Sequence, residues 1–473
     1  MLLSELLSRA PHVVLAGPVD RQVGRVVDRD DDVRPGDVFV AIRGARVDGH
    51  DRVPSLPQAA AVIVERDVQA PDGVSVVRVA DTRIALAHLC ATRLGNPGAR
   101  MKVLAITGTN GKTSSTFLVA AMARAAGIKP GIIGTTGHFI GDERIETEHT
   151  TPTAPVVQEL LARMAAAGVG IVAMEASSIG LATHRCDAIP FAAAVFTNLT
   201  RDHLDFHGSM EAYAAAKARL FHELLAGTAI LNAADPASPR MVPSDRPVWW
   251  FNDRDLWVED ARFTLHGTTA HVHTPRGNGP LRLHLLGRHN LENALGALGA
   301  VLAVGVPLDK ALLGLAALPA VPGRLERVPN HRDLHVFVDY AHTDDALHRV
   351  LQSLRQLGAR RIITVFGCGG DRDRGKRPLM GRAAAEGSDL VILTADNPRS
   401  EDPAAIIADA LPGVGATPHV VEPDRRVAIH LALERARPGD VVLIAGKGHE
   451  PYQEIHGVKH PFDDRRVAAE WLA

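Results

Sequence analysis

The stretch from Val103 to Thr116, which reads VLAITGTNGKTSST, constrains the fold of this chain more than any other. Its first five residues are mostly apolar and suit a buried strand, a loop with two glycines follows, and Lys112 opens a helix. A strand, a glycine loop and a helix N-terminus in this order attract phosphate through backbone N–H groups, the helix dipole and the lysine ammonium. The alternative is a structural turn. We predict a site for nucleotide phosphates formed by Gly108, Thr109, Asn110, Gly111, Lys112 and Thr113.

The composition sets limits on partners and location. The 473 residues correspond to about three domains, and 52 Lys and Arg against 54 Asp and Glu leave a net charge of −2, which favours neither nucleic acid nor an anionic membrane as partner. The three cysteines are far apart in the sequence, as in proteins of a reducing cytosol. No stretch resembles a signal peptide or a membrane span. We expect a cytoplasmic monomer with small-molecule substrates, without nucleic-acid or membrane partners.

The alternation of apolar and helical patterns predicts an α/β fold with three domains. Residues 1–99 form a small α/β unit without a catalytic signature, and Asn96-Pro97-Gly98 ends it. Residues 100–324 alternate strands and helices around a mainly parallel sheet, and a more β-like patch covers 261–273 and 281–286. Residues 325–473 repeat the alternation as a Rossmann-like unit, without the glycine fingerprint of a dinucleotide site. In such sheets the chemistry is expected at the carboxyl ends of the strands.

Two polar features of the central segment follow strands, and a third lies on a helix. Glu175 ends the apolar strand 170–175, where its carboxylate could hold Mg²⁺, although a charge at a helix N-terminus is the simpler alternative. The segment 198–208 contains five ionisable side chains, and His203 is a possible ligand of a second metal ion, although spacing alone leaves open which histidine acts. Lys217 lies on the predicted helix 211–224, where a lysine is usually a surface residue.

The last segment places polar loops after several strands. These are Asp339-Tyr340-Ala341-His342, the basic run 371–377 behind a glycine-rich turn, 396–399 and 446–450. Arginine pairs bidentately with carboxylates and phosphates, so the loops could bind both the ammonium and the carboxylate of an amino acid. Ordinary loops with solvated charges are the alternative.

Taken together, these motifs resemble those of the Mur ligase family: TGTNGKT, MEASS, NLTRDHLDFHG, GRHNLENALGA, PGRLERV, DYAH, DNPR and GKGHE, in this order. The resemblance implies an N-terminal domain for a UDP-linked substrate, a central ATPase domain and a C-terminal domain that brings an amino acid. It also implies that ATP phosphorylates a peptide carboxylate and that the amine of the amino acid attacks the acyl phosphate. The DNPR motif resembles the version that selects meso-diaminopimelate, which would be added to UDP-N-acetylmuramoyl-L-alanyl-D-glutamate during peptidoglycan precursor synthesis.

The resemblance also implies roles for individual residues. Two Mg²⁺ ions would be served by Thr113, Glu175, His203 and Lys217, the last as a carbamylated lysine, with Lys112 on the phosphates. Further contacts to ATP would come from Asn293, Arg324 and Asp339. Diaminopimelate would be bound by Arg372, Asn397, Arg399, Gly446 and Glu450, with Arg399 on the distal carboxylate. The UDP-linked substrate would contact Asp30, Thr150, Thr151, Ser177, Thr183 and Arg185.

The sequence departs from the family pattern on the side of the UDP-linked substrate. Asp30, Asp31 and Asp32 stand where the family usually has Asp-Ser-Arg, and Ile179 and Thr183 replace a histidine and a glutamine. A second hypothesis therefore keeps the ligase chemistry but assigns another carboxylate acceptor. A third, a nucleotide-binding regulatory protein, is disfavoured by the retained Lys112, Glu175, His203 and Lys217.

Overall fold

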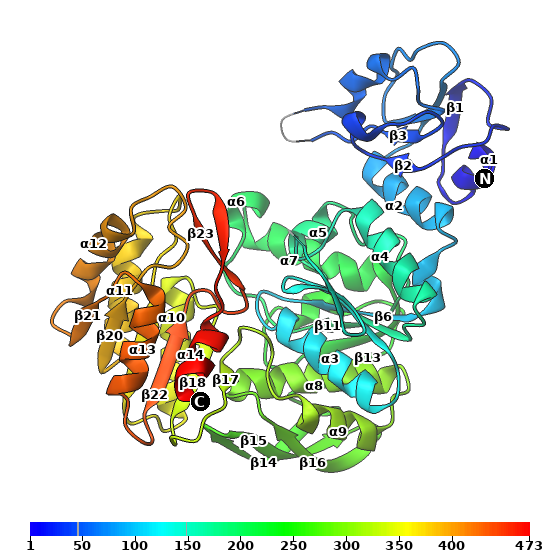
Figure 1. Ribbon diagram of the computed structural model, residues 1–473. Helices are drawn as coiled ribbons and strands as arrows, with labels where there is room; N and C mark the ends of the chain where they lie inside the picture. The colour runs from blue at the N-terminus through cyan, green and yellow to red at the C-terminus, as the bar shows by residue number, and fades with distance from the viewer. Residues whose placement is uncertain (45–46, 148) are drawn as a thin grey trace. The chain divides into compact units, whose positions relative to one another are not determined.

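A computed structural model describes residues 1–44, 47–147 and 149–473 (Figure 1). The chain forms two compact units. The first comprises Met1–Val258, Val272–Gly279 and Glu292–Leu315, and the second comprises Glu259–His271, Pro280–Leu291 and Ala316–Ala473. Within the described part of the chain, no helix has the length and apolarity needed to cross a membrane. The domain boundaries near residues 99 and 324 stay predictions.

The first unit begins with a five-stranded sheet in the order β1-β5-β4-β3-β2. Its strands are β1 (Val13–Ala16), β2 (Val26–Val27), β3 (Val38–Val40), β4 (Ala61–Val64) and β5 (Ser75–Arg78). Only the edge strand β1 runs antiparallel to its neighbour. Helix α2 (Thr82–Arg93) is capped by the Asp81 carboxylate, which accepts from the N–H groups of Arg83 and Ile84, and buries Leu86 and Leu89 in the core of this sheet. The predicted small α/β unit is therefore present.

The central sheet of the first unit has eight strands in the order β13-β12-β11-β6-β10-β7-β8-β9. Six are parallel, namely β6 (Lys102–Thr107), β7 (Pro130–Gly134), β10 (Ile171–Glu175), β11 (Phe191–Phe196), β12 (Leu225–Asn232) and β13 (Val248–Phe251). The antiparallel edge consists of β8 (Gly137–Ile140) and β9 (Glu143–Ile145). Helix α3 (Lys112–Ala125) packs against β7 and β10, and α4 (Ala154–Ala166) contributes to an apolar core with β6 and β10. The predicted strand, glycine loop and helix are confirmed.

A three-stranded sheet confirms the predicted β-like patch, in the order β14-β15-β16. Its strands are β14 (Trp257–Thr264), β15 (Gly267–Thr274) and β16 (Gly277–Leu283), followed by helices α8 (Arg288–Ala303) and α9 (Leu308–Ala317).

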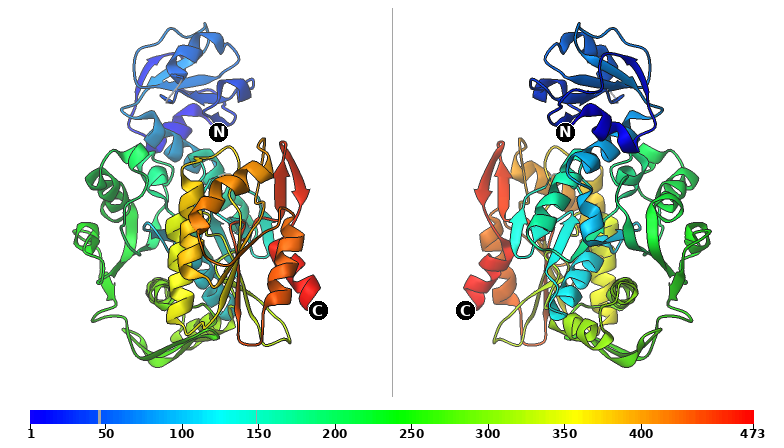
Figure 2. Two further views of the ribbon diagram at one scale, coloured as in Figure 1. Left: turned by 90° about the vertical axis from the view of Figure 1, so that its left-hand side faces the viewer. Right: turned by 90° about the vertical axis from the view of Figure 1, so that its right-hand side faces the viewer.

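The second unit is built on a six-stranded sheet in the order β17-β18-β22-β19-β20-β21. Its strands are β17 (Glu326–Val328), β18 (His335–Asp339), β19 (Ile362–Phe366), β20 (Leu390–Leu393), β21 (His419–Val421) and β22 (Val441–Ala445), and only β17 is antiparallel. One core joins the sheet to α10 (Asp344–Gln356), α11 (Lys376–Gly387) and α12 (Pro403–Val414). A second core on alternate sheet residues joins it to α13 (Arg425–Arg435) and α14 (Asp464–Leu472), so helices flank both faces (Figure 2). The predicted Rossmann-like unit is confirmed.

Candidate active site

The two glycines of the phosphate loop are required by their surroundings. Gly108 has φ +147°, and a Cβ there would lie 1.9 Å from Thr197 Oγ1 at the end of β11. Gly111 has φ +88°, and its Cβ would lie 2.1 Å from Asn293 Oδ1 of α8. The loop backbone thus packs directly on two neighbours, and any side chain would push it away from them. This packing brings Asn293, a predicted ATP contact, beside Gly111.

Two lysines converge on the carbonyl groups of the same loop. Lys112 Nζ donates to Gly108 O at 2.9 Å and to Thr109 O at 2.8 Å, and Lys217 Nζ donates to Gly108 O at 2.9 Å. The Thr109 hydroxyl lies 3.0 Å from the Tyr213 hydroxyl. The predicted phosphate-binding residues and Lys217 therefore form one group, to which the structure adds Tyr213.

Glu175 supplies oxygen ligands next to the helix that begins at the loop. Its side chain is buried, Oε1 accepts from the Thr113 hydroxyl at 3.0 Å and from the Thr135 N–H at 2.9 Å, and Oε2 accepts from the Thr135 hydroxyl at 3.1 Å. Hydroxyl and carboxylate oxygens are the ligands that Mg²⁺ prefers. The structure thus brings together two of the predicted metal ligands. Thr135 was missed, although its position directly after β7 could have predicted it.

Lys217 lies on α7 (Met210–Arg219) with only 1% of its surface exposed. Burial and then the positive charge of Lys112 lower the pKa of the Lys217 ammonium well below its ordinary value, and the Asp202 carboxylate opposes this shift. Its nitrogen lies 4.5 Å from the centre of the Tyr213 ring. A lowered pKa increases the fraction of the neutral amine, which is the nucleophilic form.

His203 lies in the segment behind β11, at the start of the short helix α6 (Leu204–His207). It has φ +51°, and its ring packs edge-on toward Tyr213 at a centroid distance of 6.2 Å. Its Nε2 is 3.6 Å from Asp202 Oδ2, and nearly half of the side chain is exposed. The imidazole therefore has a carboxylate that can orient it, as metal-binding histidines require.

Four of the predicted contacts to the UDP-linked substrate gather behind β10. Thr151 Oγ1 donates to Glu175 O at 2.8 Å and accepts from the Ser177 N–H at 3.0 Å, while Arg185 Nη1 donates to Thr151 O at 2.8 Å. The Thr150 hydroxyl lies 2.9 Å from the hydroxyl of Thr135. This hydroxyl-rich group with one arginine is suited to an anionic or polar ligand.

The other two predicted contacts lie in other surroundings. Thr183 directly follows the short helix α5 (Ser178–Ala182), and its hydroxyl donates to Ile179 O in that helix at 2.7 Å. Asp30 lies in the short helix η2 (Asp30–Asp32) of the N-terminal segment, where its carboxylate is 3.5 Å from Arg52 Nε.

In the second unit, Asp339 at the end of β18 is held by backbone donors. It accepts from the N–H groups of Leu325 at 2.7 Å and Ala341 at 2.8 Å. Burial raises the pKa of the Asp339 carboxyl, and the positive charge of Arg324 counteracts that rise. The Arg324 guanidinium lies 5.7 Å from the centre of the Tyr340 ring. Arg324 and Asp339, both predicted ATP contacts, are therefore neighbours.

The loops after β20 and β22 interlock through the predicted amino-acid contacts. Asn397 Nδ2 donates to Glu450 Oε2 at 2.8 Å, and the buried Lys447 Nζ donates to Asn397 Oδ1 at 3.0 Å. Gly446 has φ +114°, and a Cβ there would lie 2.5 Å from Asp396 Oδ2. Asn397, Gly446 and Glu450 thus form one preorganised group at the carboxyl ends of the strands.

Arg399 and Arg372 lie on the loops after β20 and β19. Arg399 Nη1 donates to Gly370 O at 2.7 Å, and its Nε is 3.3 Å from Glu454 Oε2. Arg372 is exposed in the basic run.

Arg377 of the same run is buried instead, and it pairs with Glu401 at 2.7 Å and with Asp409 at 2.9 Å. This arginine therefore links α11 to α12 and to the loop before α12.

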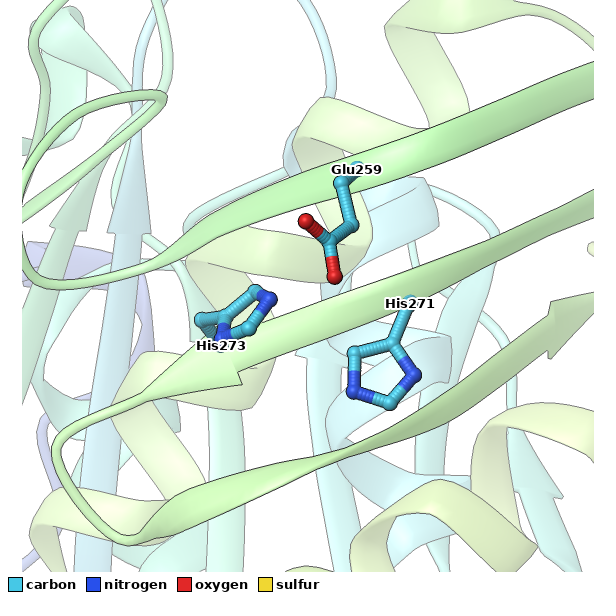
Figure 3. A group of neighbouring side chains, drawn as sticks. All are labelled: Glu259, His271 and His273. Carbon is cyan, nitrogen blue, oxygen red and sulfur yellow. The ribbon is translucent and has the colours of Figure 1, made fainter.

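A separate group of ligand-type side chains lies on the three-stranded sheet (Figure 3). Glu259 of β14 and His271 and His273 of β15 each offer one donor atom, and these atoms lie within 4.8 Å of one another. The His273 ring stacks on Trp257 with a centroid distance of 3.9 Å. This group was not predicted from the sequence, although two histidines separated by one residue on a strand point to the same face.

A phosphate loop beside Mg²⁺-type oxygen ligands, followed by an α/β unit with a preorganised polar group at the carboxyl ends of its strands, indicates a nucleotide-dependent enzyme of the α/β class. Residues 106–301 match the Mur ligase middle domain, and residues 323–448 match the Mur ligase glutamate ligase domain. The chain belongs to the Mur ligase family, and it is an ATP-dependent ligase with the fold predicted from its sequence.

Individual relatives support this assignment along nearly the whole chain. The UDP-N-acetylmuramoyl-L-alanyl-D-glutamate–2,6-diaminopimelate ligase of Geobacter metallireducens is 44% identical, over 92% of this chain and 91% of that protein. A solved structure of a ligase with the same name is 34% identical, with a TM-score of 0.75 and 99% coverage of both chains. The MurF ligase of Thermotoga maritima in complex with ADP shares the fold at 22% identity, with a TM-score of 0.59 and coverage of 90% and 94%.

Proposed function

We propose that this chain joins the amine of meso-diaminopimelate to the free carboxylate of the glutamyl residue in UDP-N-acetylmuramoyl-L-alanyl-D-glutamate, using ATP. The observation that supports the proposal most is the presence in one chain of two groups: Lys112, Thr113 and Glu175 for a nucleotide, and Asn397 with Glu450 for an amino acid. Near-full-length relatives carry the name of this reaction.

The chemistry follows from the weakness of a carboxylate as an electrophile. An oxygen of the glutamyl carboxylate attacks the γ-phosphorus of ATP, the bond to the β,γ-bridging oxygen breaks, and ADP leaves. The deprotonated amine then attacks the carbonyl carbon of the acyl phosphate, the amide bond forms, and phosphate departs with the electron pair of the C–O bond. Lys112 and the N–H groups of the loop bind the phosphates and orient the γ-phosphorus.

The residues of the loop fit a divalent cation. The Thr113 hydroxyl and the Glu175 carboxylate lie 3.0 Å apart and would hold one Mg²⁺, which supplies positive charge against the negative charge of the phosphates. His203 would serve the second ion. Both Mg²⁺ sites remain part of the proposal.

Lys217 is suited to carbamylation. Its pKa is lowered by burial, so the neutral amine can attack CO₂; the N–C bond forms and the nitrogen releases one proton to water. The product would be an anion in place of a cation, on a nitrogen that lies 2.9 Å from Gly108 O in the unmodified chain. Such an anion offsets a cation held nearby, which the ammonium of an unmodified lysine would repel.

The UDP-linked substrate would lie against the hydroxyl-rich group of Thr150, Thr151, Ser177 and Arg185. A second candidate function keeps the chemistry but uses another carboxylate acceptor. It is favoured by Thr183, whose hydroxyl donates to Ile179 O, and by the carboxylates of Asp31 and Asp32, which stand where the family usually has serine and arginine and would repel a pyrophosphate. The monomeric state and the cytoplasmic location also stay predictions.

An assay of inorganic phosphate tests the proposed chemistry. The purified chain receives ATP and Mg²⁺ with the UDP-linked dipeptide, with diaminopimelate, or with both. We expect sustained phosphate release only with both substrates, because the acyl phosphate is consumed by the amine. Equal release from ATP alone would refute a ligase role, and release that needs diaminopimelate with a different carboxylate would support the second candidate.

A further inference from the structure

Arg425 is an arginine without any exposed surface on its side chain. It is the first residue of α13, and it pairs with Asp464, the first residue of α14, which is equally buried. Its Nε donates to Asp464 Oδ1 at 2.8 Å, and its Nη2 donates to Oδ2 at 2.7 Å. The two side chains therefore form a bidentate pair with fixed relative orientation.

The same guanidinium also binds the ends of two strands. Arg425 Nη2 donates to Ala445 O at 3.0 Å, and Nη1 donates to Ala395 O at 3.3 Å. Ala445 ends β22, and Ala395 follows β20; these strands are not neighbours, because β19 lies between them. One side chain thus ties two loops across an intervening strand.

These two carbonyl groups immediately precede the loops of the amino-acid group. The residues after them, Asp396 and Gly446, touch each other so closely that a Cβ on Gly446 would lie 2.5 Å from the Asp396 carboxylate. One residue further along, Lys447 Nζ donates to Asn397 Oδ1 at 3.0 Å. The spacing of the loops therefore sets the distance between Asn397 and Glu450, whose side chains meet at 2.8 Å.

We propose that Arg425, oriented by Asp464, is a positioning residue for the amino-acid site. This inference rests on the proposed function, because it assumes that the loops after β20 and β22 bind the incoming amino acid. A buried ion pair gains little net stability over apolar packing, since both charges lose their hydration. Here the planar guanidinium gives something that apolar packing does not: donors in fixed directions to one carboxylate and two carbonyl groups.

The test variant is Arg425→Lys, which keeps the positive charge but loses the fork of donors. We expect the KM for diaminopimelate to rise by about tenfold or more, because displacement by a fraction of an ångström is costly at a preorganised site, while the KM for ATP changes by less than about twofold. Asp464→Asn, which retains the shape of the partner, should shift the same ratio in the same direction.

The matched control is Arg426→Lys. Arg426 is the next residue of α13, and it also pairs with α14, through Glu470 at 2.9 Å. About half of each side chain is exposed, and this ion pair involves no strand end. We expect both KM values of this variant to equal those of the wild type. An unchanged KM for diaminopimelate in Arg425→Lys, or an equal rise in both KM values, would overturn the proposal.

Hydrogen exchange of the wild-type chain provides an independent readout if the variants do not fold. With increasing denaturant, the amides of 396–399 and 446–450 should lose protection in the same opening event as the first turn of α13. Opening of the loops while that turn stays protected would contradict the proposed link. Absence of any turnover of diaminopimelate by the wild type would refute the proposed function instead, and the exchange result would then decide the link alone.

Discussion

Replacing Arg399 with alanine removes the guanidinium that we assign to the distal carboxylate of diaminopimelate. The side chain is about three-quarters buried and is fixed by Gly370 O at 2.7 Å and by Glu454 at 3.3 Å. A guanidinium has five N–H donors, so these contacts leave donors for a substrate carboxylate. A hydrogen bond between charged groups contributes about 1.5–3 kcal/mol. At about 1.4 kcal/mol per factor of ten, kcat/KM for diaminopimelate should fall by about 10- to 100-fold.

The assay compares diaminopimelate with lysine, which lacks the distal carboxylate. Arg399→Ala should lower kcat/KM for diaminopimelate but leave the low kcat/KM for lysine nearly unchanged. The ratio of the two kcat/KM values should therefore decrease by about 10- to 100-fold. Glu454→Gln is the control, since it removes the ion pair at 3.3 Å and retains the guanidinium. Equal losses with both amino acids, or an equal effect on the KM for ATP, would refute the assigned contact.

Three further predictions concern the first unit. Lys217→Ala should lose activity and regain part of it with short carboxylic acids that replace the carbamate; full activity of the plain variant in the ligase assay would contradict the assignment. Gly108→Ala should lose ATP-dependent activity and about 2–4 kcal/mol in the free energy of unfolding, because its Cβ would lie 1.9 Å from Thr197 Oγ1. The control is Gly127→Ala, where φ is +75° and a Cβ would meet no atom within 4 Å, and it should lose only about 1–2 kcal/mol from backbone strain. In CO₂-free buffer, the folded chain should bind fewer protons than the unfolded chain between the lowered pKa of Lys217 and its ordinary value of 10.5. In that pH range the free energy of unfolding of the wild type should therefore rise with pH relative to Lys217→Met in chemical denaturation, and a constant difference between the two would show that the pKa of Lys217 is not lowered.

Local patterns predicted the parts of the fold whose signals are contiguous in the sequence. The apolar run of β6, the glycine loop and the start of the helix after it lie within about a dozen residues of one another. Helix α13 was not predicted, although Asp424 caps its start and Ala428, Ile429, Ala432 and Leu433 recur at helical spacing on its buried face.

Long-range contacts could not be derived from the sequence pattern. Asn293 packs on Gly111 from a helix about 180 residues away along the chain, and only the family resemblance indicated it. Arg425 has the sequence context of a surface arginine, because its partner Asp464 lies 39 residues further on. Conversely, the basic run 371–377 suggested ligand binding throughout, whereas Arg377 is buried in ion pairs. Burial decides the role of a charged residue, and burial is a property of the folded chain.

The central claim is that this ligase joins diaminopimelate to the UDP-linked muramoyl dipeptide. The most direct measurement is mass spectrometry of the products after incubation with ATP, Mg²⁺, the UDP-linked dipeptide and equal amounts of diaminopimelate, lysine and ornithine. We predict a single new species whose mass equals that of the dipeptide substrate plus diaminopimelate minus water, formed together with one ADP per product. A product containing lysine or ornithine instead, or an unmodified UDP-linked dipeptide under conditions in which another carboxylate is ligated, would contradict the claim.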